Sequence, residues 1–162
     1  MPVVINRLVA FGQAAVASLP SSIAGRTIGY GWATVDLDRA VEELGEALGI
    51  PLGRFAVAPD SRALGARCRV AGAVLPDGSS LAVLEPKTEG RLAATLARVG
   101  EGPAAIWLAA ANGRQQRATS TERESPFSTE HEGPFGVERL IRGGPAHGPH
   151  RLLVGPPGTI RA

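Results

Sequence analysis

Two histidines near the end of the chain are the side chains best suited to proton transfer. His147 and His150 stand three residues apart in a run rich in glycine and proline, residues 143–150. An imidazole changes its charge near neutral pH, so this pair could serve a substrate as general acid and base. Glycines and prolines predict a loop, and loops carry solvent-exposed histidines as well as sites. We therefore weigh a catalytic pair against a plain surface loop, and against a metal site completed by His131 and Glu132.

A pair of arginines forms the second candidate. Arg67 and Arg69 alternate with Cys68 and Val70 in a stretch typical of a β-strand, which places both guanidinium groups on one face. Facing inward, Arg69 and its neighbour would hold a carboxylate or phosphate through paired hydrogen bonds; facing outward, they are surface charge. Cys68 is the only cysteine. We expect it to be a small buried residue in a protein of the reducing cytoplasm.

The spacing of apolar residues and turns predicts a β-α-β-β-β unit followed by a second unit that also opens on a strand. Apolar residues at helical spacing, ending at Gly49 and Pro51, predict a helix after the first strand. The run Pro76–Ser79 is typical of a hairpin turn. The strands of the first unit are expected at 27–35, 54–58, 67–75 and 80–85. A helix at 89–99 and strands at 103–110, 136–142 and 151–154 follow, a polar loop spans 112–132, and an apolar helix spans 3–18.

Three segments resemble the vicinal oxygen chelate superfamily, which includes glyoxalases, bleomycin-resistance proteins and extradiol dioxygenases. Residues 33–40 resemble the strand-to-helix turn that opens its module, and residues 84–86 resemble the end of the module's last strand. Residues 96–106 resemble the start of the second module in the methylmalonyl-CoA epimerase branch. The resemblance implies an α+β fold in which paired β-α-β-β-β modules form a cupped mixed sheet, with a degenerate second module.

The resemblance also implies how the chain is organised. We expect an N-terminal apolar helix or arm at 1–26, a first module at 27–88 and a divergent second module at 89–162. The family's final strand would lie beyond Thr159 and Ile160, so we expect it to be missing from this chain. An unpaired sheet edge promotes association. We therefore expect a homodimer, or an edge covered by the apolar segment Val3–Phe11.

Members of this superfamily hold a divalent metal ion with His, Gln or Glu side chains on four strands. Carried onto this sequence, three of the four ligand positions fall on Gly29, Ala82 and Ala105, and the fourth falls on the missing final strand. Glycine and alanine side chains have no donor atom. We therefore expect neither a metal ion nor another cofactor.

With the strand orientation that the resemblance implies, alternation along the strands predicts what lines the cup instead. The residues expected to face inward and bind a ligand are Gly29, Gly31, Ala82, Ala105 and Trp107. The same alternation turns Glu85 outward, where it would be solvated or ion-paired. The cup is thus predicted to be roomy and apolar, with Trp107 as its one large flat surface, which suits an apolar or planar ligand.

Charge and composition limit the classes of partner that the protein is expected to bind. The net charge is only +2, and the 17 Lys and Arg residues are scattered along the chain, whereas nucleic-acid binding needs a clustered basic face. No apolar run is long enough to span a bilayer. We expect a small-molecule partner rather than nucleic acid or a membrane.

Two functions remain open. The first is a metal-independent isomerase or lyase that acts on a small carbonyl or acyl compound, with His147, His150 or an inward-facing Arg as acid and base. The second is a non-catalytic small-molecule binding or resistance protein. Besides these two, we weigh a degenerate domain with a structural or interaction role. The lining of the largest cavity separates the first two: a His, Glu or Asp there favours catalysis, and only small apolar residues and Trp favour binding.

Overall fold

The computed structural model of the protein describes residues 2–110 and 126–155. The helices are α1 (Pro2–Ala17), α2 (Leu37–Leu48), the short 3-10 helix η1 (Leu52–Arg54) and α3 (Arg91–Val99). The strands are β1 (Gly25–Ala33), β2 (Phe55–Ser61), β3 (Ala66–Ala71), β4 (Ser80–Pro86), β5 (Gly102–Ala110), β6 (His131–Gly133), β7 (Gly136–Leu140) and β8 (His150–Val154). Most of the predicted polar loop 112–132 lies outside the described residues, but its end forms β6 rather than loop.

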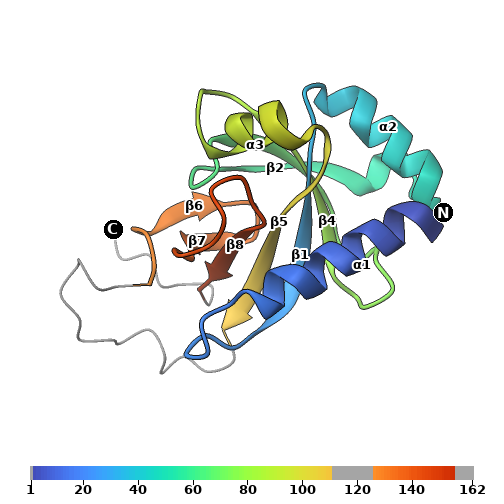
Figure 1. Ribbon diagram of the computed structural model, residues 1–162. Helices are drawn as coiled ribbons and strands as arrows, with labels where there is room; N and C mark the ends of the chain where they lie inside the picture. The colour runs from blue at the N-terminus through green and yellow to red at the C-terminus, as the bar shows by residue number, and fades with distance from the viewer. Residues whose placement is uncertain (1, 111–125, 156–162) are drawn as a thin grey trace.

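One curved sheet contains all eight of these strands, in the order β2-β3-β4-β1-β5-β8-β7-β6. In each half, the first strand pairs in parallel with the last, β1 with β4 and β5 with β8, and the halves join through antiparallel β1 and β5. The predicted α+β fold of paired modules in a cupped mixed sheet is confirmed (Figure 1).

The expectation of a missing final strand was wrong. β8 takes that place beside β5, because its buried run Leu152–Val154 supplies the apolar side chains that a central strand needs. The two outermost strands also approach one another: Arg62, beside β2, donates its N–H to the carbonyl of Glu132 in β6 at 3.2 Å. β2 and β6 thus meet at this point although they are the end strands of the sheet order, and α1 packs on a face of the sheet instead of along its edge.

Helices α1 and α2 cover the convex face of the sheet (Figure 1). Asp36 begins α2 by accepting the N–H of Arg39 at 3.1 Å, and Gly49 ends it in the left-handed conformation, with φ of 67°. Glu85 accepts the N–H of Leu37 at 2.9 Å, which confirms that its side chain faces out of the cup. Tyr30, Leu81, Val83, Ile106 and Leu108 are among the sheet residues buried under these helices.

The concave face carries the second core cluster, and α3 closes it at one end through Leu92 and Leu96. The predicted alternation is confirmed: Ala82, Ala105 and Trp107 belong to this cluster. Within the described ranges, no helix is long and apolar enough to cross a membrane.

Candidate functional site

Aromatic rings fill the cup that was expected to be hollow. Trp107 is completely buried, and the ring of Phe135 meets its ring edge-on, with centroids 5.1 Å apart. A Cβ added at Gly29 would lie 2.6 Å from the Phe135 ring, and one at Gly31 would lie 2.9 Å from the Trp107 ring. These two positions are small because rings occupy the space above them, and the prediction of a roomy apolar cup was wrong.

A buried carboxyl group, which the sequence did not single out, lies among these rings. Glu138 of β7 is completely buried. One oxygen accepts hydrogen bonds from Ser61 Oγ at 2.6 Å and from the N–H of Ala63 at 3.3 Å, and the other accepts from Trp107 Nε1 at 2.8 Å. Burial raises the pKa of Glu138, although these donors act in the opposite direction. Alternation in β7 pairs Glu138 with buried Leu140 on one face, the only signal that could have found it.

The pairing of the strands locates the fourth metal-ligand position of the family pattern. In the first half, the ligand position Ala82 on β4 lies opposite Gly31, which is two residues after the ligand position Gly29 on β1. In the second half, the ligand position on β5 is Ala105, and Trp107, two residues after it, lies opposite Leu152 of β8. Leu152 therefore occupies the fourth position. The antiparallel register of β1 and β5 agrees with this mapping, because Gly29 lies opposite Trp107 and Gly31 opposite Ala105.

These residues do not fit a metal ion. The four positions hold hydrogen, methyl or isobutyl groups at Gly29, Ala82, Ala105 and Leu152, none of which carries a donor atom. No group of three or more His, Cys, Asp or Glu side chains in the described part of the chain could hold a metal either, which includes the alternative site with His131 and Glu132. The chemistry of the site therefore has to come from other side chains.

The two candidate histidines have different surroundings. His150 is buried at the start of β8, and its Nε2 lies 2.8 Å from Thr95 Oγ1 in α3. Because Thr95 donates its hydroxyl proton to the carbonyl of Arg91, it accepts from Nε2–H, and the proton-free nitrogen of neutral His150 is Nδ1. Burial, followed by the charges of Arg91 and His147, lowers the pKa of His150 to about 4. His147 is exposed in the β7–β8 loop, so the two imidazoles do not line one cavity.

Arg69 lies on the convex side and cannot bind a ligand in the cup. It forms an ion pair with Asp38 of α2 at 3.1 Å, and Arg67 forms one with Glu85 at 2.8 Å. The physical reason is the alternation of β3, in which Cys68 takes the inward position. Burial raises the pKa of the Cys68 thiol to about 12, so it is an inert packing group.

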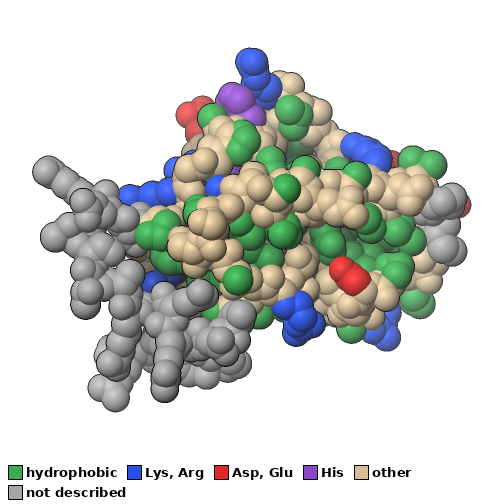
Figure 2. Space-filling view, turned by 60° about the horizontal axis from the view of Figure 1, so that its bottom comes forward, with side chains coloured by type: hydrophobic (Ala, Val, Ile, Leu, Met, Phe, Trp, Pro, Cys, Tyr) green, Lys and Arg blue, Asp and Glu red, His purple; other side chains and the backbone are tan. Residues whose placement is uncertain are grey.

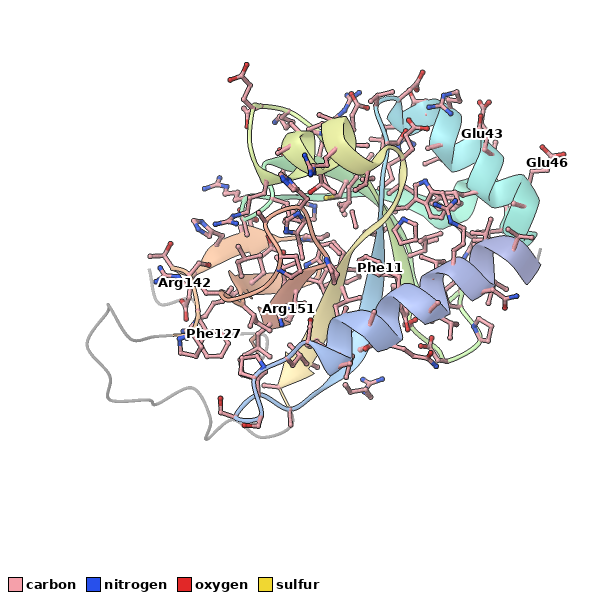
Figure 3. The ribbon with its side chains drawn as sticks, in the orientation of Figure 1. Phe11, Glu43, Glu46, Phe127, Arg142 and Arg151 are labelled. Carbon is pink, nitrogen blue, oxygen red and sulfur yellow. The ribbon has the colours of Figure 1, made fainter. Side chains whose placement is uncertain are left out.

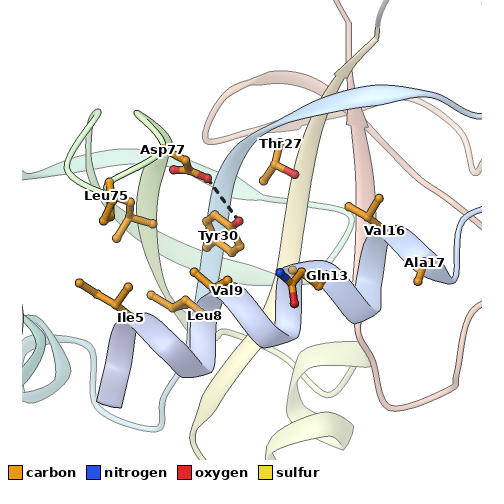
Figure 4. Close-up of a pocket in the computed structure, with 12 residues that line it drawn as sticks. Ile5, Leu8, Val9, Gln13, Val16, Ala17, Thr27, Tyr30, Leu75 and Asp77 are labelled. Atoms are coloured by element: carbon orange, nitrogen blue, oxygen red, sulfur yellow. Dashed lines mark hydrogen bonds between the residues drawn. The ribbon is translucent and has the colours of Figure 1, made fainter. Parts of the chain in front are cut away.

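A groove along α1 has a volume of about 560 Å³ (Figure 4). It lies on the convex face, between α1, β1 and the β3–β4 turn. Figure 2 shows the hydrophobic side chains that surround this hollow. Its lining consists of Ile5, Leu8, Val9, Gly12, Gln13, Val16, Ala17, Thr27, Tyr30, Leu75, Pro76 and Asp77.

The groove contains one charged group, the carboxylate of Asp77. Tyr30 Oη donates to it across 3.4 Å, and the N–H of Ser79 donates across 2.9 Å. Burial acts to raise the pKa of Asp77, but the hydrogen bonds from Ser79 and Tyr30 outweigh it and leave the pKa below its usual value. Burial and the nearby Asp77 raise the pKa of Tyr30. At neutral pH the groove therefore offers a carboxylate and a neutral phenol in apolar surroundings.

Solved structures of similar fold were found, although no sequence-family model and no curated protein matches the chain. A variant of the Streptomyces coelicolor methylmalonyl-CoA epimerase, in complex with 2-nitronate-propionyl-CoA, is 24% identical with a TM-score of 0.57, covering 80% of this chain and 95% of that one. The Mycobacterium tuberculosis methylmalonyl-CoA epimerase is 20% identical with a TM-score of 0.60, covering 85% and 93%. A hypothetical protein from Bacillus halodurans is 14% identical with a TM-score of 0.61, covering 86% and 99%.

At these identities the likeness concerns the fold. It agrees with the strand pairing of the two halves and with the three segments that resemble the superfamily. The chain therefore shares the overall fold of these methylmalonyl-CoA epimerase structures.

Proposed function

We propose that this protein binds an apolar small molecule in the α1 groove, without metal chemistry. The observation that carries the proposal is the groove itself: about 560 Å³ of mostly apolar lining with a few convergent polar groups, the usual form of a small-molecule site. The lining includes Asp77 but no histidine, and the hydrogen bonds that keep Asp77 ionised make it a weak base. In the cup, by contrast, the rings of Phe135 and Trp107 occupy the space next to Gly29 and Gly31.

The charge in the groove indicates the ligand class. Asp77 is the only ionisable group there besides Tyr30, and its carboxylate accepts hydrogen bonds but cannot donate any. A ligand with an apolar body and an ammonium or N–H group would match this lining, whereas a carboxylate would be repelled. The hydrogen bond from Tyr30 Oη to Asp77 supports this match, because at 3.4 Å it is long and a stronger donor on a ligand can replace it. A cytoplasmic location remains part of the proposal.

Fluorescence of the apolar dye N-phenylnaphthylamine tests the groove. Val9 lines it and is 44% exposed, so Val9→Trp fills the groove without disturbing the core. We expect this variant to weaken dye binding about tenfold or more. Val57→Trp is the matched control, because Val57 is 81% exposed on β2, which contributes no residue to the groove. Equal dye binding by wild type and Val9→Trp, or equal loss in both variants, would reject the site.

Displacement of the dye tests the ligand class. Octylamine, octanol and octanoate share one chain length and differ in charge at pH 7. We expect octylammonium to displace the dye best and octanoate worst. Asp77→Asn keeps the shape of the side chain and removes its charge, so it should abolish the preference for the amine. If the three ligands displace the dye from that variant in the same order, the charge of Asp77 does not determine which ligand is preferred.

Glu138 favours a second candidate function, a metal-independent isomerase acting on an acyl compound. It is a carboxyl group of raised pKa inside the cup, and the Streptomyces coelicolor neighbour is an epimerase with a CoA ligand. Proton exchange at the carbon next to a thioester carbonyl, followed by NMR in deuterated water, tests it. Exchange that is catalysed by wild type and lost in Glu138→Gln supports the enzyme, and no exchange above the uncatalysed rate rejects it.

A further inference from the structure

A second and much smaller pocket lies at the other end of the fold, where α3 meets the loop between β7 and β8. Its volume is about 100 Å³, and Arg91, Arg142, Gly143, Gly144 and His150 contribute to its lining. This space is large enough for a group of a few heavy atoms. We propose that this α3 pocket binds a tetrahedral oxyanion, either inorganic phosphate or the phosphate group of a monoester.

The charges around the pocket are all of one sign. Arg91 and Arg142 form no ion pair within the described part of the chain, although Arg39, Arg67 and Arg139 each pair with a carboxylate. None of the residues that line the pocket is acidic. Two unpaired guanidinium groups at one small pocket give the fork-shaped donors that bind phosphate oxygens well.

A third guanidinium group is buried directly behind the pocket wall. Arg151 is 1% exposed, and a Cβ at Gly144 would lie 2.7 Å from its Nη2. Arg151 donates to carbonyl or hydroxyl oxygens of Ser18 and Arg142, but no described carboxylate pairs with it, and its Nε has no partner. A buried charge without a counterion is costly. An anion on the other side of Gly144 would offset that cost.

The loop wall of the pocket carries positive charge only. In Figure 3, Arg142 lies on the side of β6 and β7, away from Glu43 and Glu46 of α2. Residues 139–155 contain no Asp or Glu. This loop therefore attracts an anion to the α3 pocket, whereas on the helix side Glu89 stands two residues before Arg91.

The N-terminus of α3 borders the pocket. Arg91 is the first residue of α3, a helix of nine residues whose N-cap, Gly90, supplies no side-chain hydrogen bond to the free N–H groups. On the opposite wall, Gly143 has φ of 83°, which favours glycine, and a side chain at Gly144 would require the end of Arg151 to shift. The pocket thus joins a helix N-terminus to two arginines and a third, buried one behind them.

NMR titration with inorganic phosphate at constant ionic strength tests the proposal. We expect saturable shifts confined to Arg91, Arg142–Gly144 and His150, and about tenfold weaker binding for Arg91→Gln. Arg98→Gln is the matched control, because it removes the same charge from the far end of the same helix and should leave the affinity unchanged. Phosphate should also raise the pH at which His150 titrates, because the anion offsets the charge of Arg91.

The outcomes separate this proposal from the alternatives. Equal weakening by Arg91→Gln and Arg98→Gln would mean that phosphate responds only to the net charge, and an absence of saturable shifts would mean that there is no site; either result overturns the proposal. Glycerol phosphate serves as the second probe: tighter binding than inorganic phosphate assigns the pocket to an ester, and weaker binding assigns it to the free anion. Val9→Trp should leave phosphate binding intact, so failure of the α1 groove does not affect this test.

Discussion

Single residues decide what this fold can do, and His150 shows how strongly burial acts on one of them. The pKa of His150 is lowered to about 4, against about 6.5 in an unfolded chain. Between these values the unfolded chain binds the proton that the native protein excludes. The native state is therefore favoured above pH 6.5, and this contribution is lost as the pH falls towards 4.

The first prediction concerns that window. A difference of about two and a half pKa units corresponds to roughly 3 kcal/mol of unfolding free energy lost between pH 6.5 and 4. In His150→Gln the neutral amide does not titrate, so the same pH change should cost clearly less. Urea unfolding at pH 7, 5.5 and 4.5 measures how the unfolding free energy of each protein depends on pH. Parallel curves for the two proteins would show that His150 is not the group responsible.

The network around Glu138 gives a second prediction at this scale. Ser61→Ala leaves a buried carboxyl oxygen short of its 2.6 Å donor, and we expect the unfolding free energy to fall by about 1–3 kcal/mol. In a Glu138→Leu background the same substitution removes no partner, so its cost should fall to a few tenths of a kcal/mol. Urea unfolding of the four proteins in this cycle measures the difference. A cost that is the same in both backgrounds contradicts the assigned hydrogen bond.

Alternation predicted which residues of each strand face the cup, but not what would fill it. Gly29, Gly31 and Trp107 were placed correctly, because the period of a strand is a local property. Phe135 fills the space over Gly29 from a distance of more than 100 positions in the chain. A contact of that kind depends on the tertiary arrangement of the β6–β7 hairpin, which no local pattern encodes.

At the scale of elements, the helix over residues 3–18 was predicted, but the face of the sheet on which it packs was not. Apolar side chains surround α1 on several sides, since Val3, Val9 and Val16 are 69%, 44% and 43% exposed while Leu8 is buried. A helix that is apolar all round does not indicate which of its faces meets the sheet. The structure shows that Gly12 lies against the ring of Tyr30, so the smallest residue of the helix sets how closely α1 approaches.

This close approach gives the third prediction. A Cβ at Gly12 would lie 2.6 Å from a ring carbon of Tyr30, so Gly12→Ala must push α1 away from the sheet. Alanine gains about 1 kcal/mol from helix propensity, but overpacking costs about 1–3 kcal/mol, and we expect a net loss. Gly53→Ala is the control, because no atom lies within 4 Å of its added Cβ. Thermal and urea unfolding compare the two, and a stabilised Gly12→Ala would show that α1 tolerates a wider spacing.

For the whole molecule, the closure of the sheet is the property that sequence analysis missed. Placing the last strand beyond Ile160 implied an open edge, whereas β8 completes the second half and brings β2 and β6 together. The sequence could not show this, because β6 is a three-residue strand inside a polar stretch, and it carries almost no apolar signal. The closed shape explains why Glu138 and Trp107 are fully buried in a cup that the fold could have left open.

β2 and β6 meet as the end strands of the sheet order rather than as a paired ladder. Besides the hydrogen bonds from Ser61 and Ala63 to Glu138 of β7, the N–H of Arg62 donates to Glu132, and the same two residues form an exposed ion pair at 3.9 Å. Ile106, in contrast, is buried in β5 between two strands. We expect the amide of Arg62 to exchange with deuterium at least about a hundredfold faster than that of Ile106, because local opening needs less free energy than global unfolding. Glu132→Gln should change the Arg62 rate only severalfold, since exposed ion pairs contribute little. Equal protection of the two amides would show instead that the sheet opens only as a whole, and that the cup can admit a molecule only through unfolding.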